Sequence, residues 1–408
     1  MRVGIHYGLE RAEYEVADAN LVVPRRQPRS APVPDIGQAV TNALEMPHGF
    51  PALRKALTPD DHVVIVVDNR LPHLDEMLTA VVEYLIQARI PPTAITLLYA
   101  SSPSTGVNGQ LPGHPEIAVE IHDASHRKKL SYLATTRKGR RLYLNRTAVD
   151  ADQLIVLSGR GYDPLLGYSG AVGELFPALC DDETKQLLTA ELSNDVPSTE
   201  PWPIRREADE AAWLLGAPFM IQVIEGLGKE IVHVLGGVAD TAGENERLLN
   251  AEWRVTVDRP VDAVVAGLSG DPSRHGFEEL ARALACAARV VKPRGRIVLL
   301  SQAEPTLGAG AQILRQSDEP GIALKDLRLQ KPPDIGPCFQ WASAADHAEI
   351  YMLSRLEPEI AEELFTTPLS TASQAQRLLA AGEVLFLEDA HKSLAVIDDQ
   401  NEEAGWTS

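Results

Sequence analysis

The sequence has little cysteine, no excess of positive charge and no long hydrophobic run. Its three cysteines lie far apart and form no CxxC pair or Cys/His cluster, which excludes a disulfide framework and a structural zinc site as the organising principle. The 38 Lys and Arg residues stand against 57 Asp and Glu residues, a formal charge of -19, which disfavours nucleic acid and anionic membranes as partners. No stretch of about 18 apolar residues occurs, and the N-terminus lacks an apolar core of signal-peptide length. We therefore expect a cytoplasmic protein with reduced, buried thiols.

The composition is that of an ordinary folded protein. The 408 residues are 44% apolar and 23% charged, and a chain of this length is typically divided into two or three domains. The densest basic run is Arg137 to Arg141, in TTRKGRRLYL. It is compatible with a solvated edge or with a local contact to an anion.

Two segments of the chain predict βαβ units. In the first, HVVIVV (62–67) and ITLLYA (95–100) flank an amphipathic helix that begins near Pro72. In the second, VDAVVAGLSG (261–270) and RIVLLS (296–301) flank a helix that begins near Phe277. Continuous apolar runs of this kind are typical of strands buried on both faces, and the crossovers predict parallel pairing.

The remaining pattern completes a two-domain α/β fold with parallel-rich sheets and a ligand cleft between the domains. Residues 218–224 and 230–237 indicate a hairpin, and the polar, Pro-rich stretch 193–210 indicates a surface connection. The predicted domains are an N-terminal α/β domain (1–255), a C-terminal α/β domain (256–395) and an acidic flexible tail (396–408).

Polar residues directly after the predicted strands are the first candidates for a ligand site, because ligands of open α/β sheets bind beyond the carboxyl ends of the strands. Asp68 and Arg70 follow the first strand. They suit an anionic ligand, although Asp68 is also compatible with a helix cap near Pro72. The glycine-rich stretch 158–174 contains Ser169 and Gly170, whose N–H groups suit an anion. Loop turns without a functional role remain the alternative there.

The histidines and nucleophiles give no stronger motif. His122, Asp123 and His126 have helical metal-ligand spacing, but VEIHDASHRKKL indicates a strand end followed by a turn. The sequence contains no GxSxG elbow. We expect no metal site from these residues.

Five segments in order, GFPALRKAL (49–57), VVIVVDNRLP (63–72), ITLLYA, residues 121–170 and residues 277–310, resemble the nickel-pincer lactate racemase family. The resemblance implies two α/β domains and racemase or epimerase chemistry on 2-hydroxy acids. It also implies a nickel pincer nucleotide carried between the domains.

The residues that carry out the family's chemistry are replaced by other residue types at the matching positions of this sequence. Asp163 takes the place of an acid/base histidine, Gly173 that of the lysine that anchors the pincer nucleotide, and Thr189 that of a nickel-binding histidine. At the place of the family's second acid/base histidine, this sequence has Ser101 to Ser104 and no histidine. Glycine cannot form the covalent link and threonine is a poor nickel ligand, so we expect no covalently tethered nickel pincer and leave the cofactor unknown.

The candidate site residues fall into two groups. The candidate catalytic residues are Asp163 and His122. The candidate ligand- or cofactor-binding residues are Asp68, Arg70, Ser169, Gly170, Glu279 and Arg282. The resemblance implies that Asp68, Ser169 and Asp163 lie on neighbouring strand ends and face Arg282 across the cleft.

Two functions stay open at this point. The first is a racemase- or epimerase-type isomerase of a small 2-hydroxy acid or related carboxylate, in which Asp163 is the acid/base and Arg70 and Arg282 hold the carboxylate. The second is a binding protein that keeps a nucleotide or carboxylate ligand without catalysis. Both predict a small anionic ligand as the partner.

Overall fold

The computed structural model describes residues 1–101, 109–197, 200–238 and 242–398. The chain forms two compact units, each assembled from separate stretches. Unit 1 contains residues 1–29, 189–196 and 250–408, and unit 2 contains residues 30–188 and 197–249. Residues 102–104, which belong to the segment compared with the family's second acid/base histidine, lie outside the described residues. Most of the predicted acidic tail also lies outside them.

Unit 2 is built on a six-stranded sheet. Its strands, in sheet order, are β13 (Ile231–Gly237), β12 (Phe219–Glu225), β9 (Gln153–Gly159), β4 (Val63–Val67), β5 (Ile95–Tyr99) and β6 (Ala118–Ile121). Every neighbouring pair is parallel except β12 with β13, which form the predicted hairpin. The first predicted βαβ unit is confirmed as β4, α2 (Leu74–Gln87) and β5.

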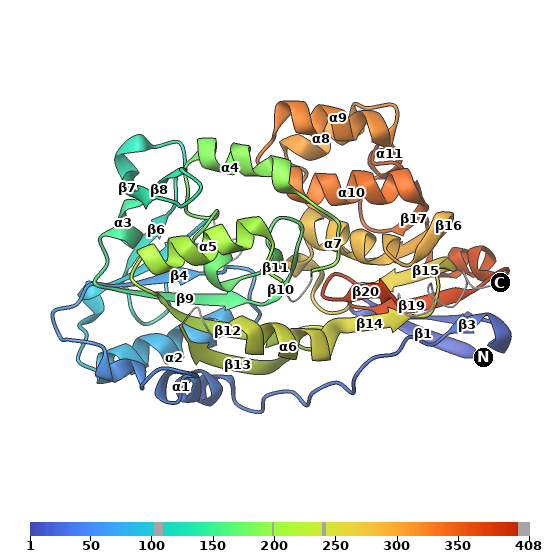
Figure 1. Cartoon of the computed structure of the whole chain (residues 1–408). Helices are drawn as coiled ribbons and strands as arrows, with labels where there is room; N and C mark the ends of the chain where they lie inside the picture. The colour runs from blue at the N-terminus through green and yellow to red at the C-terminus, as the bar shows by residue number, and fades with distance from the viewer. Residues whose placement is uncertain (102–108, 198–199, 239–241, 399–408) are drawn as a thin grey trace, which may run out of the picture. The chain divides into compact units, whose positions relative to one another are not determined.

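Helices cover both faces of this sheet because β4 presents apolar side chains to each side. Val63, Ile65 and Val67 belong to the core shared with α1 (Ile36–Glu45) and α2, whereas the alternate residues face the core shared with α5 (Pro203–Leu214). Figure 1 shows α1 and α2 below the strands and α5 above them. Two smaller helices of unit 2 are α3 (Arg146–Val149) and α4 (Asp182–Leu188). The remaining helix, α6 (Ala242–Trp253), begins in unit 2 and ends in unit 1.

Unit 1 contains a second six-stranded sheet, and all its neighbouring strands are parallel. The order is β18 (Thr366–Pro368), β17 (Glu349–Leu353), β16 (Val291–Leu300), β15 (Val261–Gly267), β19 (Val384–Glu388) and β3 (Leu21–Val22). The second predicted βαβ unit is confirmed as β15, α7 (Phe277–Ala288) and β16.

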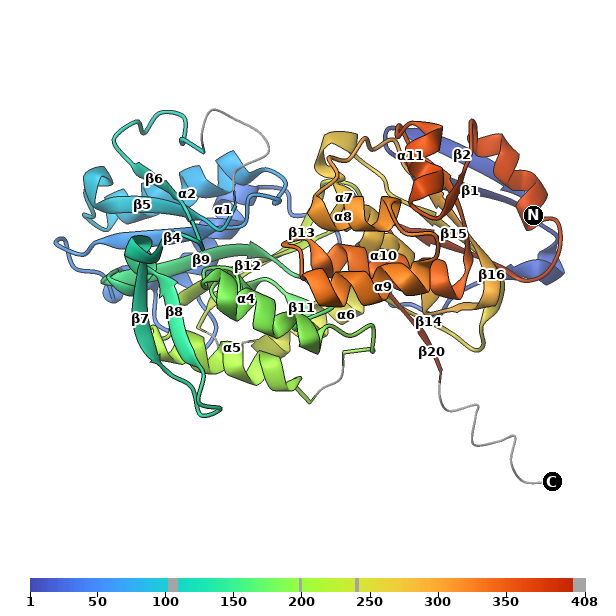
Figure 2. The ribbon, with the colours of Figure 1, turned by 90° about the horizontal axis from the view of Figure 1, so that it is seen from above.

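The two faces of the unit 1 sheet are covered differently. The core on one face includes residues of α7, α8 (Ala309–Arg315), α9 (Pro320–Gln330), α10 (Ile335–His347) and α11 (Pro358–Glu363). The other face packs against the hairpin of β1 (Arg2–Tyr7) and β2 (Glu10–Glu15). Figure 2 shows α8, α9 and α10 side by side. A separate parallel pair joins β14 (Arg254–Val257) to β20 (Leu394–Ile397).

The division into units differs from the predicted domains at the N-terminus. The predicted boundary at residue 255 lies close to the transition at residue 250, but the first 29 residues belong with the C-terminal part. The reason is strand pairing, because β3 adds to the edge of the unit 1 sheet beside β19. A two-residue strand is too short to be recognised in the sequence as a sheet edge.

Two further expectations, on the cysteines and on the stretch 193–210, have structural outcomes. Cys180, Cys286 and Cys338 are buried and free, as predicted. The stretch 193–210 is only partly a surface connection, since α5 begins at Pro203.

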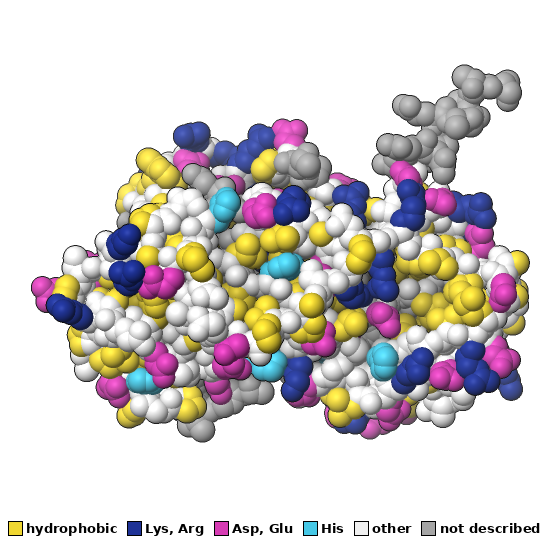
Figure 3. All heavy atoms as spheres, turned by 90° about the horizontal axis from the view of Figure 1, so that it is seen from below, with side chains coloured by type: hydrophobic (Ala, Val, Ile, Leu, Met, Phe, Trp, Pro, Cys, Tyr) yellow, Lys and Arg dark blue, Asp and Glu magenta, His cyan; other side chains and the backbone are white. Residues whose placement is uncertain are grey.

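The surface view of Figure 3 shows cationic and anionic side chains interspersed on the face that it draws. Within the described residues, every helix is too short or too polar to cross a bilayer.

Candidate functional site at the carboxyl edge of the unit 2 sheet

The carboxyl ends of five parallel strands of unit 2 lie at one edge of the sheet. Val67 pairs with Leu157 on one side and with Tyr99 on the other, so the residues that follow β4, β5 and β9 emerge together. The backbone N–H of Asp68 continues this pattern and donates to the carbonyl of Leu157 at 2.9 Å. Candidate ligand groups therefore gather at this edge, as expected for an open parallel sheet.

Asp68 organises the end of β4. Its side chain is 6% exposed, and Oδ1 accepts from the backbone N–H of Arg70 at 3.1 Å and from Arg70 Nε at 3.0 Å. Oδ2 accepts from the backbone N–H of Gly159 at 3.2 Å. Burial opposes the charge of this carboxylate, but Arg70 and the two backbone donors outweigh burial and lower the pKa of Asp68. The alternative of a helix cap is wrong, because the N-cap of α2 is His73.

The Arg70 guanidinium projects from this anchor. Its side chain is 39% exposed, and Nη2 lies 3.6 Å from Oε1 of Glu174. Glu174 closes η5 (Ala171–Glu174), the short helical turn that follows Gly170. Arg70 is thus held between two carboxylates but keeps an accessible part that can meet a ligand.

Gly170 brings the glycine-rich loop onto the end of β9. Its φ is +76°, and a Cβ there would overlap the carbonyl oxygen of Gly159. The next residue, Ala171, donates its backbone N–H to Oγ of the fully buried Ser158 at 2.8 Å. The loop and Asp68 therefore meet at the same strand end, where Asp68 binds the N–H of Gly159 and Gly170 covers its carbonyl.

Ser169 and Asp163 lie on a small hairpin beyond β9. The hairpin pairs β10 (Gly161–Asp163) with β11 (Gly167–Ser169). Oδ1 of Asp163 accepts the backbone N–H groups of Leu165 and Leu166 at 2.8 and 2.7 Å. The Asp163 carboxylate is thus engaged in closing the hairpin turn, and an acid/base role would compete with these two bonds.

A buried arginine pair supports this hairpin. Arg160 Nη1 donates to the carbonyl of Ser169 at 2.6 Å, and Arg205 Nη1 donates to the carbonyl of Tyr168 at 3.3 Å. Both guanidinium groups approach Oε1 of Glu246, at 3.5 and 3.6 Å. Burial, together with the neighbouring Arg205, lowers the pKa of Arg160 to about 9.

The sequence analysis missed this arginine pair. Arg205 is on α5 and Glu246 on α6, so only the fold brings them to Arg160. Arg205 lies in the helical pattern PIRREADE (203–210), where its charge looks like part of an ordinary polar helix face.

His122 follows β6 at the same edge. Its ring is buried, and Nε2 donates to the carbonyl of Cys180 at 2.9 Å, which places the proton of the neutral ring on Nε2. Nδ1 is buried and, within the part of the chain that the structure describes, has no hydrogen-bond partner. Burial lowers the pKa of His122. The ring is therefore neutral at pH 7 and carries an unused basic nitrogen.

Glu279 and Arg282 belong to unit 1. Glu279 Oε2 accepts the backbone N–H of Gly276 at 2.9 Å and so caps α7. Arg282 forms an ion pair with Glu278 on the same helix. The expectation that Arg282 faces the Asp68 edge across a cleft stays a prediction.

Unit 1 also contains an unpredicted histidine pair at the carboxyl edge of its sheet. His275 follows β15 and His391 follows β19, and their rings pack edge to face with centroids 5.2 Å apart. Neither Nδ1 has a partner among the described residues. Burial lowers the pKa of His275 to about 4, against the attraction of Asp389.

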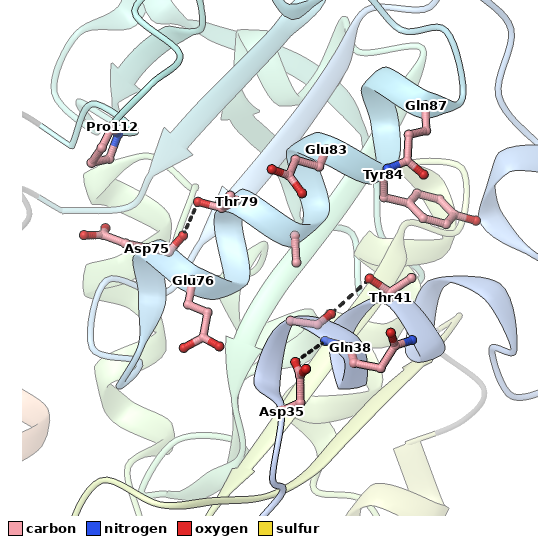
Figure 4. Close-up of a pocket in the computed structure, with 12 residues that line it drawn as sticks. Asp35, Gln38, Thr41, Asp75, Glu76, Thr79, Glu83, Tyr84, Gln87 and Pro112 are labelled. Atoms are coloured by element: carbon pink, nitrogen blue, oxygen red, sulfur yellow. Dashed lines mark hydrogen bonds between the residues drawn. The ribbon is translucent and has the colours of Figure 1, made fainter.

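A separate pocket of about 480 Å³ lies between α1 and α2 of unit 2 (Figure 4). Four of its twelve lining residues are acidic, and Figure 4 shows Asp75, Glu76 and Glu83 on one wall and Asp35 on the other. Asp35 caps α1 through the N–H of Gln38 at 2.8 Å. No three His, Cys, Asp or Glu side chains of the described ranges cluster as a metal-ligand set, here or elsewhere.

The fold and this edge define a parallel-sheet α/β protein with a candidate anion site beyond β4 and β9. Residues 7–188 match the family model of the lactate racemase N-terminal domain. A curated lactate racemase from Thermoanaerobacterium thermosaccharolyticum is 19% identical over 278 residues, which are 63% of this chain and 63% of that protein. The N-terminal part of the chain is therefore similar to the N-terminal domain of lactate racemases.

Solved structures share the fold. The lactate racemase apoprotein from T. thermosaccharolyticum superposes with a TM-score of 0.78 at 17% identity, covering 97% of this chain and 100% of the other. A protein from Thermotoga maritima superposes with a TM-score of 0.63 at 11% identity, covering 91% and 100%. These likenesses establish the α/β fold with parallel-rich sheets.

The residues present do not fit a tethered pincer nucleotide. Gly173, at the place implied for the anchoring lysine, has no side chain, and a Cβ there would lie 2.9 Å from Cδ1 of the buried Leu166. Thr189, at the place implied for the nickel-binding histidine, begins the turn η6 (Thr189–Glu191). A hydroxyl is a weak ligand for nickel. No step of the proposed function therefore passes through this group.

Proposed function

We propose that this protein binds a small carboxylate of the 2-hydroxy acid class at the carboxyl edge of the unit 2 sheet. The observation that carries the proposal is the Arg70 guanidinium, fixed by the buried Asp68 and still 39% exposed. A guanidinium offers parallel N–H donors that match a carboxylate, and a fixed guanidinium loses less side-chain freedom on binding.

The charge around Arg70 favours a small monoanion over a larger anion. Asp68 and Glu174 already lie against the guanidinium, so the local charge of these three groups sums to about -1. A phosphate would add two charges to this environment, whereas a 2-hydroxy acid adds one. Its hydroxyl can also donate to a carboxylate such as that of Glu174.

A second candidate function is an isomerase of the racemase or epimerase type at the same edge. It is supported by the lactate racemase relative and by the unpartnered Nδ1 of the neutral His122. In this function His122 accepts a proton from the ligand, and Asp163 takes part only after releasing the N–H groups of Leu165 and Leu166. Conversion of one lactate enantiomer into the other, followed by chiral chromatography, tests this candidate.

Thermal unfolding with matched ligands tests the binding proposal. Ligands that bind the folded state raise the midpoint in proportion to RT ln(1 + [L]/Kd). Lactate and glycolate should raise the midpoint, whereas lactamide, which has the same shape without the charge, should not. Equal effects of lactate and lactamide, or no effect of any 2-hydroxy acid, would contradict the proposal.

A further inference from the structure

The basic run Arg137 to Arg141 forms the tight turn between β7 (Leu130–Thr135) and β8 (Arg141–Asn145). The backbone N–H of Thr136 donates to the carbonyl of Arg140 at 2.8 Å, and Gly139 adopts a φ of +82°. Thr136 Oγ1 donates to Oε1 of the buried Glu207 on α5 at 3.2 Å. The turn is therefore fixed against a helix of unit 2.

This fixed turn borders a pocket of about 530 Å³, which we call the basic pocket. Its principal lining residues are Arg127, Lys138, Arg140, Arg141, Tyr143 and Thr184. Thr184 is on α4, and Asp181, directly before this helix, donates its backbone N–H to the carbonyl of Tyr143 on β8 at 3.3 Å. The volume lies within the range of about 300–1,000 Å³ typical of small-molecule sites.

The charge of the basic pocket is positive on a chain that is strongly acidic overall. Arg140 Nε donates to Glu207 at 2.8 Å, and Lys138 Nζ lies 3.8 Å from the same carboxylate. Within the part of the chain that is described, Arg127 and Arg141 have no carboxylate within ion-pair distance. Asp181 and Glu183 also line the pocket, but Oδ1 of Asp181 is occupied by the N–H of Thr184 at 2.8 Å.

An aromatic side chain positions one of these arginines. The Arg127 guanidinium carbon lies 4.1 Å from the ring centroid of Tyr143, a cation–π arrangement. Arg141 and Tyr143 are two residues apart on β8, so both project from the same face of the strand. Arg127 and Arg141 are thus presented to one pocket from different segments of the chain, with the face of Tyr143 beside them.

We infer that the basic pocket binds a phosphate-bearing small molecule. Two guanidinium groups without a carboxylate partner, supported by Lys138, suit the two charges of a phosphate, which arginine recognises through paired N–H donors. This site shares no lining residue with the Asp68 and Arg70 edge, and its ligand differs in charge from the monoanion proposed there. The inference therefore does not depend on the proposed function.

Calorimetric titration with pyrophosphate, ADP and adenosine tests this inference on the full chain. Wild-type protein should bind pyrophosphate and ADP but not adenosine. Arg141→Ala and Arg127→Ala should each weaken binding of both phosphate compounds about tenfold or more, the range expected for a charge-assisted bond. Tighter binding of ADP than of pyrophosphate would show that the nucleoside adds contacts, and equal affinities would show that phosphate groups suffice.

The matched control is Arg137→Ala. Arg137 is in the same turn, but its side chain is 94% exposed and does not line the pocket, so this variant should bind like wild type. Thermal unfolding of each variant serves as the check that the fold is retained. The inference is overturned if neither phosphate compound binds at about 1 mM, if adenosine binds as tightly as ADP, or if Arg141→Ala and Arg137→Ala have the same affinity.

Discussion

Asp68 and Arg70 form a closed unit at the end of β4, in which one carboxylate oxygen accepts both the backbone N–H and Nε of the same arginine, at 3.1 and 3.0 Å. The other oxygen accepts the N–H of Gly159, at the end of the adjacent strand β9. One buried side chain thus fixes a strand end and aims a guanidinium at the same time.

Replacing Asp68 by alanine should cost about 1–3 kcal/mol of unfolding free energy, because two backbone donors and one charged donor lose their acceptor. Asp68→Asn keeps one oxygen acceptor and should lose less. Urea unfolding of the two variants measures the difference. Equal stability of wild type and Asp68→Ala would show that the carboxylate does not hold the two strand ends.

Gly170→Ala should be strongly destabilising, by about 3 kcal/mol or more, since the new Cβ meets the carbonyl of Gly159 in a backbone that already has positive φ. Gly113→Ala is the matched control. Gly113 has a φ of +86° but no neighbour within 4 Å of a Cβ, so this variant should lose only the roughly 1–2 kcal/mol of the left-handed conformation. Similar losses in thermal unfolding would exclude the close contact.

The fold should lose stability in acid through His275. Because burial lowers the pKa of His275 to about 4, the unfolded chain binds the proton more readily. The contribution of the neutral His275 ring to the free energy of unfolding is complete above about pH 6.5 and falls as the pH approaches 4. The expected loss from this residue between pH 7 and pH 5 is about 2 kcal/mol.

His275→Gln should therefore show a smaller loss of stability between pH 7 and pH 5 than wild type in urea unfolding. His6→Gln is the control, because His6 is exposed on β1 of the same unit. An unchanged pH dependence in His275→Gln would mean that the ring is accessible to protons in the folded state.

The purified protein should contain no stoichiometric nickel. Gly173 offers no amine for a covalent tether, and Thr189 offers only a hydroxyl. Elemental analysis of protein from nickel-supplemented cells checks this expectation. About one nickel per chain would show that other residues hold the metal.

The fold was largely predictable because its central strands carry unmistakable patterns. Val63 to Val67 are all buried, and a short continuous apolar run rich in valine is typical of a strand covered on both faces. The position of Asp68 was predictable for the same reason, since it directly follows this run. The assignment of residues 1–29 to unit 1 was not, because it depends on the two-residue strand β3.

The candidate site was predictable only in part. Gly170 could be recognised as part of a glycine-rich loop beyond β9, but its close approach to the carbonyl of Gly159 could not. The hydrogen bonds that Asp163 accepts from Leu165 and Leu166 could not be predicted. An aspartate before a proline has the same sequence signature whether it closes a turn or binds a ligand. Arg160, Arg205 and Glu246 are brought together by helices distant in sequence, so no local pattern indicates their contact.

The most direct test of the central claim is calorimetric titration of lactate into wild type, Arg70→Ala and Arg54→Ala. Arg54 is an exposed, ion-paired arginine of the same unit, and its loss should leave affinity unchanged. Arg70→Ala should weaken lactate binding about tenfold or more, the loss expected for a charge-assisted contact of roughly 1.5–3 kcal/mol. It should also be less stable than Arg54→Ala, because the buried Asp68 loses its cationic partner, so the titrations are made at a temperature at which both variants are folded. Equal lactate affinity in Arg70→Ala and Arg54→Ala would remove Arg70 from the site and contradict the account.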